Sequence, residues 1–590
     1  MICKCPHSEN IEPQLASNCG RSTLLIFMNI LQHMLQQKCD IADPCGRIQS
    51  QSDINSRYDF IVIGGGSAGS PIAARLSEEK NFSVLLIEAG LDEHTVTQVP
   101  SFFRNYIGSA IDWNFTTESE NQACLNAKDR RCLWPRGKVL GGSSVLTGMM
   151  YMRGSKKDYD DWEKMGNKGW SFDNVLPYFI KSEDNLQINE MSNEYHGTGG
   201  PLPVGKFPYY PPISDDILKA GKELEYNTVD LNGKHQRGFA KSQCNTKNGI
   251  RFSSARAFLR PAKNRNNLHV LLNSTVTRII FDINKKAVAI LFLQNGQLKR
   301  VSVTKEVILS AGAINSPVIL LRSGVGPKKD LDYLGISVIK NLPGVGKNLH
   351  NHVSYEVAFY LNEKDTNLLN RNSINQYLKF RKGPMSGTGV TGITAMINTK
   401  YSNNSDIQLF FNGFWADCIK LKRQGKRQLS IIPTVLNAKS RGYVRLKDMN
   451  PHSKPIIVPN YFSHSDDIKT LVEGIKFSIR LSNTQALKKY GLKINTIPVK
   501  NCEEFQFGTD DYFECAIRHE TNPENHQSGS CKMGPNSDPM AVVDNKLKVR
   551  GIIGVRVADA SIMPQVISGN TNAPTIMIGE RVADFIKEEW

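Results

Sequence analysis

Three glycines with the spacing Gly64-x-Gly66-x-x-Gly69 constrain the fold of this chain more than any other feature. A run of β-forming residues precedes them, and a helix-forming segment and a second apolar run follow them. The second apolar run ends in Glu88, where a dinucleotide-binding unit carries an acidic residue for a ribose hydroxyl. The stretch therefore predicts a strand, a turn, a helix and a strand that together bind an ADP-containing dinucleotide.

Each residue of this turn has a physical role in such a unit. Gly64 permits the tight turn, Gly66 lets the backbone approach a pyrophosphate, and Gly69 lets the helix pack closely on the strand. Ser67 and Ala68 complete the turn before the helix, whose N-terminal N–H groups and dipole favour phosphate. An ordinary glycine turn is the alternative, and the flanking strands argue against it. The pattern does not distinguish FAD from NAD.

Length and charge limit the classes of protein that remain. A chain of 590 residues is too long for a single core, so two or more packed units are expected. The net charge of +17 could attract nucleic acid or an anionic surface, but no basic run is longer than a few residues. We therefore interpret the charge as scattered surface lysines and predict no nucleic-acid binding.

The twelve cysteines favour disulfides over metal sites. Three pairs lie close in the sequence: Cys39 and Cys45, Cys124 and Cys132, and Cys502 and Cys515. None forms a CxxC motif, and no His/Cys cluster has zinc spacing, so no metal site is predicted. Close pairs in polar loops fit the disulfides of a secreted chain, although spacing does not establish which cysteines are joined.

Residues 1–57 are predicted to be a leader and a poorly structured linker. An apolar run over residues 22–31 follows Arg21 and has the length of a signal-peptide core. A usual signal peptide carries fewer polar residues ahead of that core, so either translation starts later or the leader is unusual. His33, Gln36 and Gln37 end the run, so we do not expect a membrane span. Secretion is the predicted localisation.

Short strands are predicted over residues 268–272, 276–282, 287–293 and 301–303, and a buried strand that runs into a turn over 307–313. The last 75 residues are rich in glycine and small side chains and end in a predicted helix over 573–587. Because apolar strands occur at both ends of the chain, we expect a nucleotide-binding domain that is interrupted by a second domain.

Five motifs in one order now resemble a known family. They are Trp134-Pro-Arg-Gly-Lys-Val-Leu-Gly-Gly-Ser-Ser144, Gly312-Ala-Ile-Asn-Ser-Pro-Val-Ile-Leu-Leu-Arg-Ser-Gly-Val-Gly326, His526-Gln-Ser-Gly-Ser-Cys-Lys-Met-Gly534, Val557-Ala-Asp-Ala-Ser-Ile-Met-Pro564 and Gly569-Asn-Thr-Asn572. With the glycine turn, they resemble the glucose–methanol–choline (GMC) flavoprotein oxidoreductases over about residues 58–584. The segment from Cys39 to Gly46 is similar to the insect glucose dehydrogenase-like branch, whose members are commonly secreted.

The resemblance implies an α/β fold (α+β overall). A Rossmann-like FAD-binding domain would be joined to a discontinuous substrate-binding domain, built on an antiparallel sheet with helices. By resemblance, residues 58–353 hold the FAD-binding core with substrate-domain insertions, and residues 354–439 belong to the substrate domain. Residues 440–584 would complete the substrate-domain sheet and return to the FAD domain with the catalytic histidine.

The resemblance also implies the site residues. The expected FAD-binding residues are Gly64, Gly66, Ser67, Ala68, Gly69, Glu88, Arg136, Gly141, Gly142, Ser143, Thr147, Val276, Asp559 and Ala560. Some relatives tether FAD through a histidine, and because Leu146 takes that position here, we expect FAD to be bound non-covalently. His526 and Asn570 align with the catalytic pair.

The expected chemistry is oxidation of an alcohol or a sugar such as glucose, with a quinone-like electron acceptor. Flavin N5 takes a hydride, and a histidine suits the hydroxyl proton because its pKa lies near working pH. Steroid or other secondary-alcohol oxidation is the alternative substrate class.

Departures from the family pattern also leave open a catalytically weak binding or structural flavoprotein. Thr147 stands where relatives usually have Asn, and Asn525 and Gln527 flank His526 where insect relatives usually have Tyr and Pro. Asn351 stands where relatives favour Asp, and the sequence does not indicate its role.

Overall fold

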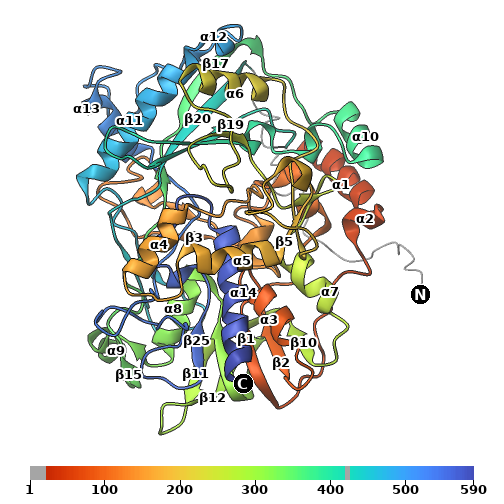
Figure 1. The fold of residues 1–590 in the computed structure, drawn as a ribbon, viewed down its shortest axis with the longest axis vertical. Coiled ribbons are helices and arrows are strands. Elements are labelled where there is room, and N and C mark those ends of the chain that lie inside the picture. The colour runs from red at the N-terminus through yellow and green to blue at the C-terminus, as the bar shows by residue number, and fades with distance from the viewer. Residues whose placement is uncertain (1–21, 419–424) are drawn as a thin grey trace.

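The structure is a computed structural model and describes residues 22–418 and 425–590. Two sheets organise it, one in the lower half of Figure 1 and one in the upper half. The first has the order β10-β2-β1-β13-β12-β11, with β25 beside β13. Its strands are β1 (Arg57–Ile63), β2 (Val84–Ile87), β10 (Leu268–Leu271), β11 (Ser274–Phe281), β12 (Ala287–Gln294), β13 (Gln297–Leu309) and β25 (Val555–Val557).

The predicted strand–turn–helix–strand unit is present in the parallel part of this sheet. β1 pairs in parallel with both β2 and β13, and the helix after the glycine turn is α3 (Gly69–Leu76). β2 is buried along its whole length, as expected for a parallel strand with covered faces. The C-terminal helix α14 (Asn572–Glu589) packs against α3 and against α5 (Phe172–Ser182). Segments from both ends of the chain therefore pack together beside the same sheet.

β13 is a single strand of 13 residues, so the prediction of separate strands over 301–303 and 307–313 is wrong. The polar residue Glu306 interrupts the apolar run but is itself buried. Its carboxylate pairs with Arg556 of β25, with Nε and Oε2 2.6 Å apart. Because this ion pair compensates the charge of Glu306, the strand continues through this polar position, where the apolar pattern of the sequence predicted that it would be interrupted.

The second sheet is antiparallel and has the order β23-β17-β20-β19-β18-β7, with β16 beside β20 and β24 beside β16. Its strands are β7 (Gly238–Lys241), β16 (Val353–Ser354), β17 (Val357–Lys364), β18 (Ile393–Ile397), β19 (Ile407–Asn412), β20 (Lys426–Val435), β23 (Lys493–Ile494) and β24 (Asn522–Pro523). Helix α11 (Ser465–Ser482) packs on β19 and β20. These dispersed strands form the antiparallel sheet that the resemblance implied.

Residues 22–42 of the predicted leader and linker form two helices, whereas residues 43–56 contain only turns, bends and irregular backbone. Helices α1 (Ser22–Gln36) and α2 (Cys39–Ala42) cover the loop after β2. Met28, Leu31 and Leu35 of α1 are buried in a cluster with Val96 and Val99. Apolar residues of the 22–31 run therefore contribute to this buried cluster. Residues 1–21 lie outside the described residues.

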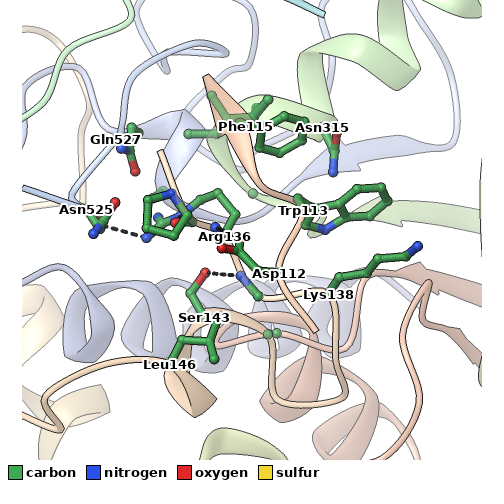
Figure 2. A pocket seen from close by; sticks show the side chains of 18 of the residues that line it. Asp112, Trp113, Phe115, Arg136, Lys138, Ser143, Leu146, Asn315, Asn525 and Gln527 are labelled. Atoms are coloured by element: carbon green, nitrogen blue, oxygen red, sulfur yellow. Dashed lines mark hydrogen bonds between the residues drawn. The ribbon is translucent and has the colours of Figure 1, made fainter. Parts of the chain in front are cut away.

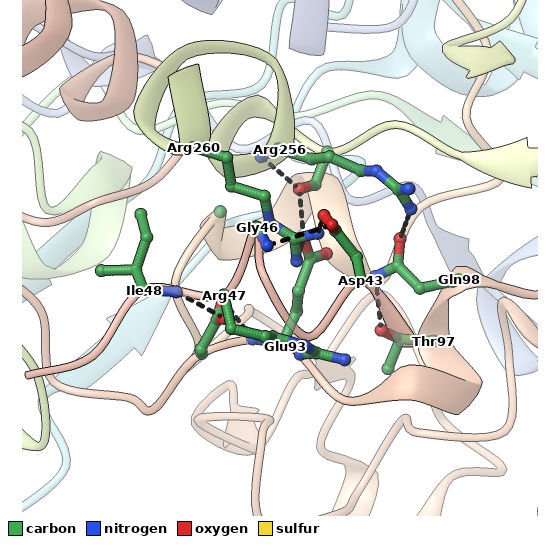
Figure 3. A network of polar contacts seen from close by, with 12 residues as sticks. Asp43, Gly46, Arg47, Ile48, Glu93, Thr97, Gln98, Arg256 and Arg260 are labelled. Atoms are coloured by element: carbon green, nitrogen blue, oxygen red, sulfur yellow. Dashed lines mark hydrogen bonds and ion pairs between the residues drawn. The ribbon is translucent and has the colours of Figure 1, made fainter. Parts of the chain in front are cut away.

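An ion network fastens the segment after α2 to the rest of the domain (Figure 3). Arg260 binds Asp43 on one side and Glu93 on the other, where Nη2 and Oε1 are 2.8 Å apart. Asp43 Oδ1 also accepts a hydrogen bond of 3.1 Å from the backbone N–H of Gly46.

None of the described helices is both long and apolar enough to cross a membrane.

Two of the three expected cysteine pairs form disulfides, Cys124–Cys132 and Cys502–Cys515. Cys39 and Cys45 are also disulfide-bonded, but among the described residues no bond joins these two to each other. His519 Nδ1 lies 3.5 Å from both sulfurs of the Cys502–Cys515 disulfide. Since those sulfurs are bonded to each other, this group is not a set of thiolate ligands for a metal.

Candidate active site

A cavity of about 1170 Å³ lies between the two sheets, and we refer to it as the central cavity. On one side it is lined by the residues that follow β1, β2, β13 and β25, and on the other by Phe410, Asn412 and Ile432 of β19 and β20. Ligands of open α/β sheets bind beyond the carboxyl ends of the strands. The cavity is therefore in the position expected for a dinucleotide, with the second sheet closing its far end.

Most of the predicted site residues line the central cavity. They are Gly64, Gly66, Ser67, Ala68, Glu88, Arg136, Gly142, Ser143, Thr147, Val276, His526, Asp559, Ala560 and Asn570. Gly69 and Gly141 do not line it. A Cβ on Gly69 would lie 1.8 Å from the Gly64 carbonyl oxygen, so Gly69 serves helix packing. Gly141 N donates a 2.8 Å hydrogen bond to Gly65 O and so joins two glycine turns.

These two turns approach so closely that only glycine fits between them. A Cβ on Gly142 would lie 2.8 Å from Gly66 Cα, and Gly142 has a φ of +54°. Glu88 braces the first turn, because its Oε2 and Oε1 each accept a 2.8 Å bond, from Gly65 N and Gly90 N respectively. Burial raises the pKa of Glu88, and these backbone bonds oppose that rise. The result is a backbone cradle with a carboxylate at its edge.

Arg136 links the Gly-Gly-Ser-Ser turn to the segment that carries His526 (Figure 2). Its Nη2 donates a 2.9 Å bond to Asn525 O, and burial lowers its pKa to about 10. Ser143 Oγ accepts a 3.2 Å bond from Gly137 N. Thr147 Oγ1 accepts a 3.1 Å bond from Met149 N, so its hydroxyl oxygen supports the following turn.

Asp559 closes the opposite side of the cavity. Its Oδ2 accepts bonds from Gly312 N at 2.8 Å and from Ser316 Oγ at 2.5 Å, and its Oδ1 accepts from Ser561 N at 2.8 Å. Burial raises the pKa of Asp559, whereas these donors favour its charged form. The carboxylate lies at the first turn of α8 (Gly312–Arg322), where the helix dipole favours a negative charge.

His526 and Asn570 meet at the inner end of the cavity. Asn570 Nδ2 lies 3.1 Å from His526 Nε2, and His526 Nδ1 lies 2.9 Å from His352 Nδ1. The His526 pKa is well below its usual value because of burial, and the neighbouring His352 and Arg136 lower it further. His526 is therefore a neutral imidazole, the form that can accept a proton.

Sequence reasoning missed three residues at this end of the cavity: His352, Gln408 and Glu524. Glu524 lines the cavity, and burial raises its pKa to about 7. In the sequence, the position of Glu524 two residues before His526 is the one signal that could have indicated a role in the site. Asn351, whose role the sequence left open, accepts a 2.9 Å bond from His526 N and donates to Tyr461 Oη at 2.7 Å. Its amide holds the backbone of the catalytic segment.

Several buried polar atoms around the cavity lack a partner among the described residues. They are Ser310 Oγ, Asn525 Oδ1 and both amide atoms of Gln527. Buried polar groups are nearly always hydrogen-bonded, so these atoms fit a ligand that has polar groups of its own. The central cavity thus combines a glycine cradle, a ribose-side carboxylate and a buried neutral base. This combination is typical of an oxidoreductase that binds a dinucleotide cofactor.

Comparison with known proteins agrees with this class. Two family profiles described as GMC oxidoreductase match residues 58–354 and 438–579. Glucose dehydrogenase [FAD, quinone] of Drosophila melanogaster is 53% identical over all of this chain and 96% of its own length. Ecdysone oxidase of Spodoptera littoralis is 35% identical over 95% of this chain and 96% of its own.

A solved pyridoxine 4-oxidase superposes with a TM-score of 0.78 at 27% identity, covering 90% of this chain and 99% of that one. The chain belongs to the GMC oxidoreductase family and is an FAD-dependent oxidoreductase that acts on CH–OH groups. The cradle, the partnerless polar atoms and the cavity fit FAD.

Proposed function

We propose that this chain oxidises a sugar or a similar hydroxyl-rich alcohol, with His526 as the base and a quinone-like compound as the electron acceptor. The observation that carries the proposal is the buried neutral His526, whose Nε2 faces Asn570 at the inner end of the central cavity. FAD, when bound, supplies the hydride acceptor for this reaction. The rest of the chemistry is assigned to side chains of the chain.

In this proposal the substrate hydroxyl lies against both His526 Nε2 and Asn570 Nδ2, which are 3.1 Å apart. The hydroxyl proton passes to His526 Nε2, which is a lone-pair nitrogen in a neutral ring. The Asn570 amide donates to the substrate oxygen and holds its C–H bond in position. Arg136 is close enough to lower the pKa of His526, so its positive charge also favours developing negative charge on that oxygen.

A hydroxyl-rich substrate is supported by the polar groups at the same end of the cavity. Glu524, Asn412 and Thr391 line it together with the apolar Phe410 and Ile432. Glu524 and Asn412 each accept one hydrogen bond within the protein, from Ser354 Oγ and Thr391 Oγ1, and a sugar could pair their remaining polar atoms whereas a steroid could not. The similarity to glucose dehydrogenase supports the same substrate class and the quinone-like acceptor.

We further propose that FAD is held non-covalently, because Leu146 lines the cavity at the position of the tethering histidine and cannot form that bond. An oxidising compartment, such as the outside of the cell, is supported by the disulfides Cys124–Cys132 and Cys502–Cys515. Denaturation in acid followed by filtration should release all yellow colour from the protein, and colour retained on the chain would contradict non-covalent binding.

Anaerobic reduction of the purified holoenzyme tests the substrate proposal. The flavin absorbance should bleach with glucose or a related sugar, and a quinone should restore it. Bleaching by an ecdysteroid but not by any sugar would replace the substrate class. Flavin that is reduced by dithionite but by no alcohol would identify a binding or structural flavoprotein and would refute the proposal.

A further inference from the structure

We infer that His352 and Gln408 are positioning residues that hold His526 in the one neutral tautomer whose Nε2 is free to accept a proton. The inference rests on the proposed role of His526 as the base. It follows from four side chains in one chain of contacts, Gln408, Asn570, His526 and His352, which we call the tautomer chain. All four contribute polar atoms that are within hydrogen-bonding distance of the next member.

The orientation of Gln408 is fixed first. Thr394 Oγ1 donates its only proton to Leu409 O at 2.9 Å, so towards Gln408 it can only accept. Gln408 Nε2 therefore lies on that side, 3.1 Å from Thr394 Oγ1. The same amide nitrogen has a second proton and donates it to Asn570 Oδ1 at 3.2 Å. Gln408 is fully buried on β19, where its Nε2 also lies 3.8 Å from Met150 Sδ and its Oε1 has no partner among the described residues.

The orientation of Asn570 follows from that of Gln408. Its Oδ1 is held by Gln408, so its Nδ2 is the atom that faces His526 Nε2, 3.1 Å away. An amide nitrogen donates and does not accept. His526 Nε2 must therefore be the acceptor, which means that it carries a lone pair and no proton.

The proton of His526 then lies on Nδ1, because a neutral imidazole carries one N–H. His526 Nδ1 is 2.9 Å from His352 Nδ1, so it donates and His352 Nδ1 accepts. The single proton of His352 is left on Nε2, which is buried and has no hydrogen-bond partner among the described residues, although the backbone carbonyls of Leu436 and Ile567 lie near the ring. Both rings are buried, and burial lowers the pKa of each, so both are neutral imidazoles with one N–H apiece.

The physical consequence is that the base is prepared before the substrate arrives. Without an acceptor at position 352, the His526 proton could move to Nε2, and the ring would have no lone pair facing the hydroxyl. In a serine protease, the wrong histidine tautomer lowers kcat by about 10⁴-fold. Neither His352 nor Gln408 is required to contact the substrate, so they act through His526 and Asn570.

Nitrogen-15 NMR of histidine-labelled protein tests the inference without depending on turnover. In both the apoprotein and the holoprotein, His526 should have a protonated Nδ1 and a bare Nε2. His352→Leu removes the acceptor and should shift His526 towards the opposite tautomer. His352→Asn is the matched control, because its Oδ1 can accept in place of Nδ1 and should retain the wild-type tautomer.

Flavin reduction by the substrate gives the second readout. His352→Leu should slow it by about 10²-fold or more, as expected for a lost general base, with an unchanged flavin spectrum and little change in substrate affinity. His352→Asn should restore most of that rate. Gln408→Met frees Asn570 to turn and should produce a smaller loss of rate together with a mixture of tautomers.

Three results would overturn the inference: a bare Nδ1 on wild-type His526, a wild-type tautomer in His352→Leu, or equal losses in His352→Leu and His352→Asn. If His352→Leu does not fold, the tautomer in Gln408→Met decides. If no alcohol reduces the wild-type flavin, the proposed function fails, and the NMR result still decides whether the tautomer chain exists.

Discussion

Replacing Gly142 by alanine tests whether the two glycine turns form the FAD cradle. The new Cβ would lie 2.8 Å from Gly66 Cα, whereas carbon atoms in contact are usually about 3.5–4.0 Å apart. The turns must therefore separate by roughly 1 Å, and an overpacked site of this kind costs about 1–3 kcal/mol. The φ of +54° adds about 1–2 kcal/mol for any side chain with a Cβ.

The combined cost is about 2–5 kcal/mol, which corresponds to a loss of FAD affinity between about 30-fold and several thousand-fold if the turn opens to relieve it. Flavin content from the visible absorbance and FAD titration of the apoprotein measure it. Gly296→Ala is the matched control, because Gly296 has a φ of +76° but no atom within 4 Å. It should lower stability slightly and retain all FAD. Equal FAD affinity in the two variants would refute the cradle.

Three further predictions concern pH and the N-terminal segment. Burial raises the pKa of Glu524 to about 7, so kcat/KM should rise with pH through 7 as the carboxylate ionises. Glu524→Gln should remove this rise. If the rise persists in the variant, another group causes it. His196 is buried, which alone would lower its pKa, but hydrogen bonds to Asp230 and Glu183 raise it overall. Its contribution to stability is therefore complete below a pH of about 6.5 and is lost as the pH rises through the raised pKa. The melting temperature should consequently fall more between pH 6 and pH 9 in the wild type than in His196→Gln, and equal falls would exclude His196. Leu31→Ala should cost about 2–5 kcal/mol of unfolding free energy, whereas Ile30→Ala on the exposed face of α1 should cost less than about 1 kcal/mol. Chemical denaturation measures both free energies of unfolding. If Leu31→Ala and Ile30→Ala lower them by similarly small amounts, α1 is not packed as described.

The nucleotide-binding half of the fold was predictable because its signals are local. The Gly64 turn, the apolar β1 and β2 and the C-terminal helix each lie within a short stretch of sequence. The sheet they form could also be placed, since parallel strands with covered faces are apolar throughout. Motif resemblance added the antiparallel sheet, whose strands are too dispersed for periodicity to assemble.

The features that could not be predicted depend on contacts between residues far apart in the sequence. β13 continues through Glu306 only because Arg556, which lies far along the chain, neutralises it. The apolar run in α1 resembled a leader, and its burial against Val96 and Val99 becomes visible only when the loop after β2 is in place.

The same limit applies to the candidate site. His526 and Asn570 could be named from their motifs, whereas His352 and Gln408 carry no local signal. They are recognisable only by the atoms they face, Nδ1 of His526 and Oδ1 of Asn570.

In the proposed reaction, His526 removes a proton from an alcohol bound beside FAD. Stopped-flow anaerobic reduction by the best sugar substrate, comparing wild type with His526→Ala, tests it most directly. The variant should keep its FAD and its visible spectrum but be reduced by the substrate about 10²-fold more slowly or worse. Reduction of His526→Ala at the wild-type rate would exclude His526 as the base.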